Sequence, residues 1–193
     1  MRVTKKKVFV LALIVLCLSC LAYGTAAFFT DDVRTRNVIT TGDVEIDLLE
    51  WADADETVPF PETGVSGVMP GLSVTKIVEI KNEGTTPAFV RMKAEKDIKL
   101  AEGSQIKPDL SLITLDIDTE HWTEKDGWYY YYKALEPNEM TAPLFTTVTF
   151  EKAMGNEYQN ATATVIVSGQ AVQVKNNPGT DALSAQGWPA PEV

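Results

Sequence analysis

The feature that most constrains the fold is an alternation of apolar and polar residues with a period of two, repeated from Val44 to Gln173. At the start of this stretch, Val44, Ile46 and Leu48 alternate with acidic residues. Such alternation turns one face of a β-strand inward and the other toward solvent. Turn signals rich in Gly, Pro, Asn and Asp separate the runs, and a helical period is almost absent. We therefore predict an all-β, antiparallel sandwich.

The remaining strands are expected at regular intervals along the chain. Leu72–Lys81 and Ala88–Glu95 are predicted to pair as a hairpin around Asn82-Glu83-Gly84. Asp126-Gly127 predicts a second, two-residue hairpin turn. Met69-Pro70-Gly71 has the residues of a type II turn. Further strands are expected at Ile113–Ile117, around Trp122, and at Trp128–Tyr132, Leu144–Phe150 and Ala161–Gln173.

Two stretches lack this alternation. Trp51–Val68 is rich in acidic residues, Pro and Gly, which predicts a surface loop. Residues 175–193 contain three prolines and no period, which predicts a partly ordered tail. The sandwich domain is therefore expected to cover residues 40–174.

The first 27 residues have the composition of a secretory signal peptide. Met1–Lys7 carries four cations and no acid, and the apolar run Val8–Leu21 has about 14 residues. That length is short of the roughly 20 residues with which a helix spans a bilayer. The small residues Gly24–Ala27 follow the run, which predicts cleavage between Ala27 and Phe28. An uncleaved anchor, with membrane contact through this segment alone, is the alternative.

Both cysteines, Cys17 and Cys20, lie inside the apolar run. The exported chain would carry no disulfide, so its stability must come from its core. About 166 residues would remain after cleavage, enough for one domain of ordinary size. Lipidation of Cys20 is a second alternative to cleavage, but Cys17 stands where a lipobox has an aliphatic residue.

Removal of the signal peptide would make the chain strongly acidic. It takes away four of the 17 Lys and Arg residues and none of the 27 Asp and Glu residues, which leaves a formal charge of −14. Nucleic acid is therefore an unsuitable partner, because phosphate binding needs clustered cations. We expect low pH, salt or cations to favour self-association, because each weakens the repulsion between copies.

The segment of residues 28–39 precedes the first predicted strand without a neighbouring strand to pair with. Its apolar residues therefore have no obvious place to be buried in a monomer, and we predict that the segment is a donor strand for a second copy. These residues are Phe28, Phe29, Val33, Val38 and Ile39.

The sequence argues against catalysis and against a metal site. It has one histidine, His121, whereas hydrolytic zinc sites usually need two or three. Cysteine chemistry is excluded after cleavage, and no Gly-x-Ser-x-Gly elbow is present. Asp53–Glu56 offers oxygen ligands for Ca²⁺, but a solvated acidic loop is the simpler interpretation. We expect no catalytic, cofactor-binding or metal-binding residues. A catalytic pair of carboxylates brought together by the fold is the alternative that the sequence leaves open.

The sequence contains a run of five consecutive aromatic residues, Trp128–Tyr132. In a strand, Trp128, Tyr130 and Tyr132 lie on one face and Tyr129 and Tyr131 on the other. Packing in the core and at its rim is the favoured interpretation, and a surface for a carbohydrate or protein partner is the alternative.

The sequence also resembles a known family. Gly24–Asp31 is similar to the signal-peptide ends of Gram-positive proteins cut by SipW-type signal peptidases, the group that contains TasA and the camelysins (CalY). Similar motifs follow in the same order at Asn37–Leu48, Met69–Gly71, Lys76–Arg91, Asp126–Lys133, Leu135–Pro137, Leu144-Phe145, Gln170–Gln173 and Gly187-Trp188.

This resemblance implies a jelly-roll-like sandwich, processing by a SipW-type peptidase, and secretion to the cell surface or the extracellular matrix. It further implies a structural role in biofilm matrix fibres assembled by strand donation, in which backbone hydrogen bonds join one subunit to the next. Camelysins are also classed as metalloendopeptidases, so a secreted peptidase is one alternative function. A monomeric surface-binding module that uses the aromatic run is another.

Overall fold

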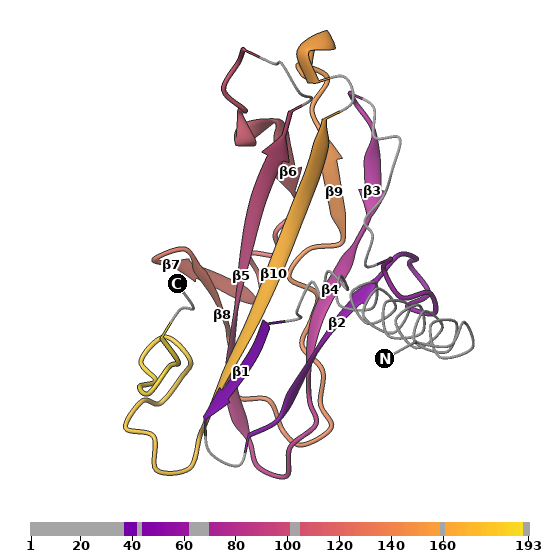
Figure 1. The fold of residues 1–193 in the computed structure, drawn as a ribbon. Coiled ribbons are helices and arrows are strands. Elements are labelled where there is room, and N and C mark those ends of the chain that lie inside the picture. The colour runs from indigo at the N-terminus through magenta and orange to yellow at the C-terminus, as the bar shows by residue number, and fades with distance from the viewer. Residues whose placement is uncertain (1–36, 42–43, 62–69, 101–104, 159–160, 191–193) are drawn as a thin grey trace, which may run out of the picture. The chain divides into compact units, whose positions relative to one another are not determined.

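The computed structural model describes residues 37–41, 44–61, 70–100, 105–158 and 161–190 (Figure 1). All of them belong to one unit, Arg36–Val193. The expected signal peptide, its cleavage site and the apolar residues Phe28, Phe29 and Val33 lie outside the described residues. Within the described ranges, no helix is long and apolar enough to cross a membrane.

The first layer is a five-stranded sheet in the order β1-β10-β5-β8-β7. Two 12-residue strands, β5 and β10, pair antiparallel along their whole length and form its centre (Figure 1). The parallel pair β1–β10 adds one edge, and the β7–β8 hairpin adds the other. The strands are β1 (Asn37–Thr41), β5 (Ala88–Lys99), β7 (Trp122–Lys125), β8 (Trp128–Tyr131) and β10 (Thr162–Gln173).

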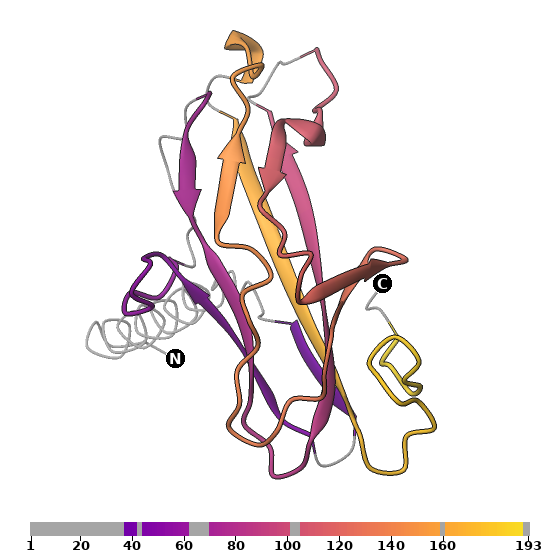
Figure 2. The same cartoon turned by 180° about the vertical axis from the view of Figure 1, so that it is seen from behind.

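The second layer contains the pairs β2–β4 and β3–β9–β6 and lies behind β5 and β10 in Figure 1. Strands β3 and β4 follow one another around Lys76, whose N–H donates to Thr146 O at 2.9 Å. The chain before β9 thus continues the sheet beside β4, and Figure 2 shows this layer from the other side. The strands are β2 (Ile46–Trp51), β3 (Ser73–Thr75), β4 (Ile77–Asn82), β6 (Ile113–Leu115) and β9 (Thr147–Phe150).

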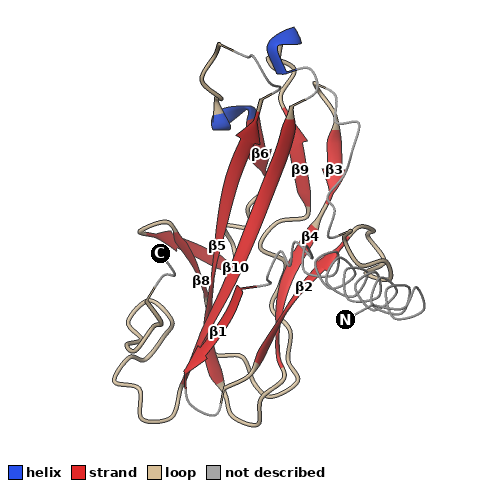
Figure 3. Cartoon of the chain, viewed as in Figure 1, coloured by secondary structure: helices blue, strands red, loops and turns tan. Residues whose placement is uncertain are grey.

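The prediction of an all-β antiparallel sandwich is confirmed. In the described part of the chain, the only helical elements are the short 3₁₀ turns η1 (Leu110–Leu112) and η2 (Asn156–Tyr158), drawn blue in Figure 3. The inward faces that the alternation predicts form one core between the layers. Its fully buried members include Leu48, Val78, Ile80, Val90, Met92, Ile113, Leu135 and Leu144.

The local turn predictions also agree with the structure. Asp126 and Gly127 have φ of 55° and 79°, as a type I′ turn between β7 and β8 requires. Gly71 follows Pro70 with φ of 81°, which suits the third position of a type II turn.

The predicted hairpin between Leu72–Lys81 and Ala88–Glu95 is wrong. Strand β4 pairs with β2, and β5 pairs with β10 and β8, so the two runs lie in opposite layers. The connection between them is held by Asn82, which is fully buried. Its amide nitrogen donates to Thr86 O and Leu135 O, both at 2.9 Å. A turn signal marks a change of direction, but it does not decide whether the next strand pairs beside the first.

The C-terminal tail is more ordered than predicted. Residues 176–190 form a series of hydrogen-bonded turns, and Ala182 and Ala185 are buried against the outer face of the first layer. The described part of the expected tail is therefore a packed element of the domain.

Candidate interaction surfaces

The first candidate surface is the edge of the five-stranded sheet that β1 only partly covers. Strand β1 pairs parallel with the second half of β10, from Asn37 opposite Ser168 to Thr41 opposite Val172. Val38 and Ile39 are thus part of the chain's own sheet. The expectation that the predicted donor segment has no partner in its own domain is wrong for these two residues, because the partner lies more than 120 positions away in sequence.

The first half of β10 has one edge that no described strand covers, and we call it the free half of β10. Residues 162–167 pair with β5 on one side, and no described residue pairs with them on the other. Ile166, the second-last residue of this half, is 48% exposed. A row of unpaired backbone N–H and C=O groups of this kind is a template for another strand.

The composition of this edge is unusual. Natural edge strands are commonly protected by charged residues or proline, but β10 (TATVIVSGQAVQ) contains neither. Its neighbour β5 offers a direct comparison, because among the described residues the stretch from Lys93 to Lys99 also has no strand on its far side. Five of those seven residues are charged. Of these two edges, the free half of β10 is the one without charged residues or proline.

The aromatic run forms the second candidate surface. Its predicted alternation is confirmed for the four residues of β8: Tyr129 and Tyr131 pack against the core, whereas Trp128 and Tyr130 pack in a second apolar cluster on the outer face of the sheet. Tyr132 follows β8 and is 55% exposed. Most of the run is therefore packing, and the part facing outward is covered by the chain's own C-terminal residues.

Arg91 lies at the centre of that outer cluster. Its side chain is on the same face as Trp128 and Tyr130, and the residue is only 8% exposed. The guanidinium carbon lies 4.1 Å from the ring centre of Trp128 and 4.5 Å from that of Trp188. Its nitrogens donate to Gln170 Oε1 and Tyr130 Oη. Indole rings and neutral oxygens thus hold this buried cation, an arrangement that favours Arg because of its planar, delocalised charge.

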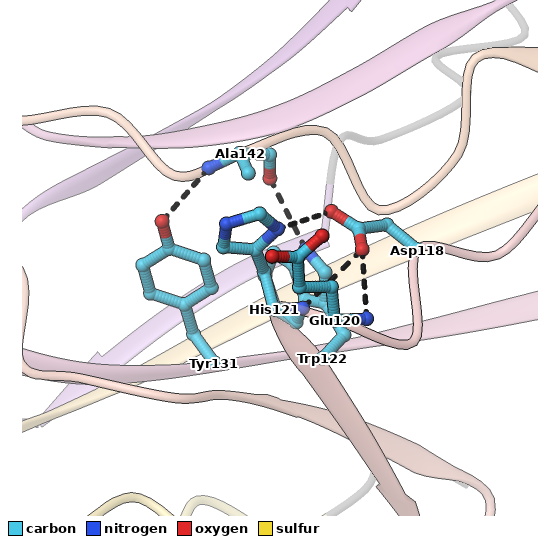
Figure 4. Close-up of polar contacts among 6 residues, drawn as sticks. All are labelled: Asp118, Glu120, His121, Trp122, Tyr131 and Ala142. Atoms are coloured by element: carbon cyan, nitrogen blue, oxygen red, sulfur yellow. Dashed lines mark hydrogen bonds and ion pairs between the residues drawn. The ribbon is translucent and has the colours of Figure 1, made fainter.

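His121 belongs to a turn that leads into β7 (Figure 4). Its Nδ1 lies 2.6 Å from Asp118 Oδ2, and Asp118 Oδ1 accepts the N–H groups of Glu120 and His121. Partial burial raises the pKa of Asp118, but the hydrogen bonds from His121 and the backbone outweigh it, so the pKa falls below its ordinary value. The carboxylate therefore caps the turn.

The residues around His121 form a structural network. Trp122 Nε1 donates to Ala142 O at 3.1 Å, and Ala142 N donates to Tyr131 Oη at 2.9 Å (Figure 4). Within the described ranges, no three His, Cys, Asp or Glu side chains are grouped so that they could hold a metal ion.

The acidic loop Asp53–Glu56 is organised by its first residue. Asp53 accepts hydrogen bonds from Thr57 N, Thr57 Oγ1 and Val58 N at 2.7–3.0 Å. The Thr57 hydroxyl and the backbone N–H groups lower the pKa of Asp53. Both oxygens of this carboxylate therefore accept hydrogen bonds from residues of the same turn, as expected for a solvated acidic loop.

Glu79 is a buried carboxyl that the sequence analysis missed. It lies on β4 and is 4% exposed, and its Oε2 has no hydrogen-bond partner. Burial, and secondly the charge of Glu56, raise the pKa of Glu79 to about 7. Period-two alternation with Val78 and Ile80 places Glu79 on the other face of β4, where a solvated side chain is expected, but the residue is buried close to Trp51 and Glu56.

No protein-family model matches this sequence, and no curated protein is significantly similar to it. The function therefore has to be argued from the residues and their geometry.

Proposed function

We propose that this chain is a secreted, non-enzymatic subunit of extracellular or biofilm matrix fibres. The observation that carries the proposal is the free half of β10, residues 162–167, which has no partner among the described residues and no charge or proline to protect it. A strand from a second copy can pair there, and its backbone hydrogen bonds supply affinity.

The donor is the N-terminal segment of another copy, as far as Arg36. Asn37 onward belongs to the chain's own β1, so the donor is shorter than the segment 28–39 predicted from the sequence. Phe28, Phe29 and Val33 supply its apolar side chains, each of which gains about 1.5 to 3 kcal/mol when fully buried. Secretion after cleavage at Ala27 by a SipW-type peptidase would make this segment the new N-terminus.

A charge placed on the free edge tests the proposal. Ile166→Lys should abolish fibres seen by electron microscopy, because a lysine on an edge strand opposes pairing with another chain. Ile106→Lys is the matched control, since Ile106 is also exposed, lies in a loop and gives the same change in charge. Normal fibres from the Ile166→Lys variant would rule out this edge as the acceptor.

Single-cysteine variants separate donation between copies from pairing within one chain. The processed chain has no cysteine of its own, so Val33→Cys and Thr164→Cys chains can be mixed and oxidised. A disulfide-linked heterodimer is expected from strand donation. If the segment pairs only with its own β10, a chain carrying both cysteines closes an internal disulfide and the mixture stays monomeric. Gln105→Cys, in an exposed loop, controls for random collision.

The camelysin-like metalloendopeptidase is tested on the same material. Metal analysis and a chelator-sensitive casein assay on the purified processed chain should both be negative. Bound metal in a defined ratio together with chelator-sensitive cleavage would replace the structural proposal with an enzymatic one.

A further inference from the structure

On the outer face of the first layer, side chains from three neighbouring strands form a cluster that residues 176–190 cover. We call this cluster the aromatic face. Its residues are Phe89, Arg91, Trp128, Tyr130, Gln170 and Val172. Residues 176–190, the C-terminal segment, cover it with Ala182, Ala185 and Trp188.

The C-terminal segment is held together by its own hydrogen bonds. Asn177 Oδ1 accepts from Gly179 N and Gln186 N, and Asn177 Nδ2 donates to Gln186 O, all at 3.0–3.1 Å. Asp181 and Ser184 close a second turn inside this ring. In the described part of the chain, every hydrogen bond of residues 176–190 stays within the segment or reaches back to Val174. The segment therefore meets the sheet only through side-chain packing.

Ala182 and Ala185 are buried in that packing, and Trp188 is partly buried. The ring of Trp188 contacts the Arg91 guanidinium and meets Tyr130 edge-on, with 5.8 Å between ring centres. Gly187 has φ of +80° and turns the chain immediately before Trp188. A side chain at Gly187 would meet no atom within 4 Å, so the glycine is required for the backbone conformation alone.

Where the segment leaves β10, a solvent-open hollow of about 340 Å³ lies on the surface, and Val172, Asn176, Pro178 and Gln186 are among its lining residues. The segment is thus a self-bonded unit that reaches the sheet only through the side chains of Ala182, Ala185 and Trp188. This is the construction of a separable latch.

We propose that the C-terminal segment is a detachable latch and that the aromatic face is a docking site for a Trp-bearing peptide of its kind, so that the same segment from a second copy can occupy it. The indole rings of Trp128 and of the incoming Trp enclose the Arg91 cation, which gives the site its selectivity for an aromatic anchor. This proposal is independent of strand donation, because it uses neither β1 nor the free edge of β10.

Hydrogen exchange on full-length variants tests the latch. Trp188→Ala and Gly187→Ala should accelerate exchange in residues 176–190 at least tenfold, while β5 and β10 stay protected. Leu183→Ala is the control, since this exposed residue belongs to the same segment. A uniform loss of protection, or failure of the Trp188→Ala chain to fold, would make the segment part of the core and overturn the proposal.

A peptide added in trans tests the docking site. The synthetic peptide Asn176–Ala190 should bind the Trp188→Ala protein in a titration by calorimetry, and the same peptide with Trp188→Ala should bind at least tenfold more weakly. The wild-type protein should bind the peptide more weakly than the variant, because its own segment occupies the site. Absence of binding to a folded Trp188→Ala protein would overturn the docking site.

Discussion

Arg91 donates two hydrogen bonds to one oxygen of Gln170, from Nε at 2.9 Å and from Nη2 at 2.6 Å. The two residues are cross-strand partners on β5 and β10, so the pair ties the two central strands together beneath Trp188. A lysine has one compact ammonium group and cannot reproduce this fork or stack flat on an indole ring.

Arg91→Lys should therefore lower the free energy of unfolding by about 1 to 3 kcal/mol. Thermal or urea unfolding measures this loss. Lys93→Arg, two residues along the same strand and more exposed, should change stability by less than about 0.5 kcal/mol. Equal effects of the two substitutions would mean that the aromatic face does not distinguish the two cations.

Glu79 should make stability fall as the pH rises from about 5 to 7. Its pKa is about 7 in the folded chain and near the ordinary value of 4.5 when unfolded, so in this window the folded state holds a proton that the unfolded state has lost. Well above pH 7, Glu79 is ionised in both states and the full loss of stability has been reached. Glu79→Gln should remove this slope in urea unfolding curves, whereas the exposed Glu45→Gln should retain it. An unchanged slope in Glu79→Gln would assign the pH dependence to other groups.

Asn82→Ala should be among the more damaging single substitutions. It would remove the Asn82 partner of the Thr86 carbonyl. Leu135 O and Gly84 N would each lose one of two partners, because Leu135 O still accepts from Ala88 N and Gly84 N still donates to Glu45 O. A buried group left unpaired costs about 1 to 3 kcal/mol, so we expect the melting temperature to fall by roughly 3 to 10 °C. Gln105→Ala removes an exposed amide and should leave the melting temperature unchanged.

Processing should produce a mature chain that starts at Phe28. Intact-mass analysis of protein secreted by a Gram-positive host checks this directly. Retention of Met1, or a lipid mass on Cys20, would contradict the signal peptide interpretation.

Acid and salt should both accelerate fibre growth. The processed chain carries a formal charge of −14; protonation of carboxylates near pH 4 reduces that charge, and salt screens it. Turbidity and electron microscopy across pH 4–7 and 0.05–0.5 M salt measure the rate. Growth that slows under both conditions would argue against self-association.

Most strands, their inward faces and the tight turns could be predicted from the sequence, whereas β1 could not. These features depend on short-range physics: alternation in Val44–Leu48 selects a face, and Asp126-Gly127 accepts the positive φ of a hairpin turn because of its own backbone preferences. The same reasoning located the two faces of the aromatic run, with Tyr131 toward the core and Tyr130 away from it.

The identity of neighbouring strands, and of the residues that cover them, became known from the three-dimensional fold. The pairing of Asn37 with Ser168, the separation of β4 from β5 into two layers, and the packing of Trp188 on Arg91 each join distant parts of the chain. Periodicity carries no information about such partners, because a strand offers the same backbone groups to any neighbour. The raised pKa of Glu79 has the same origin, since its burial depends on how distant segments pack.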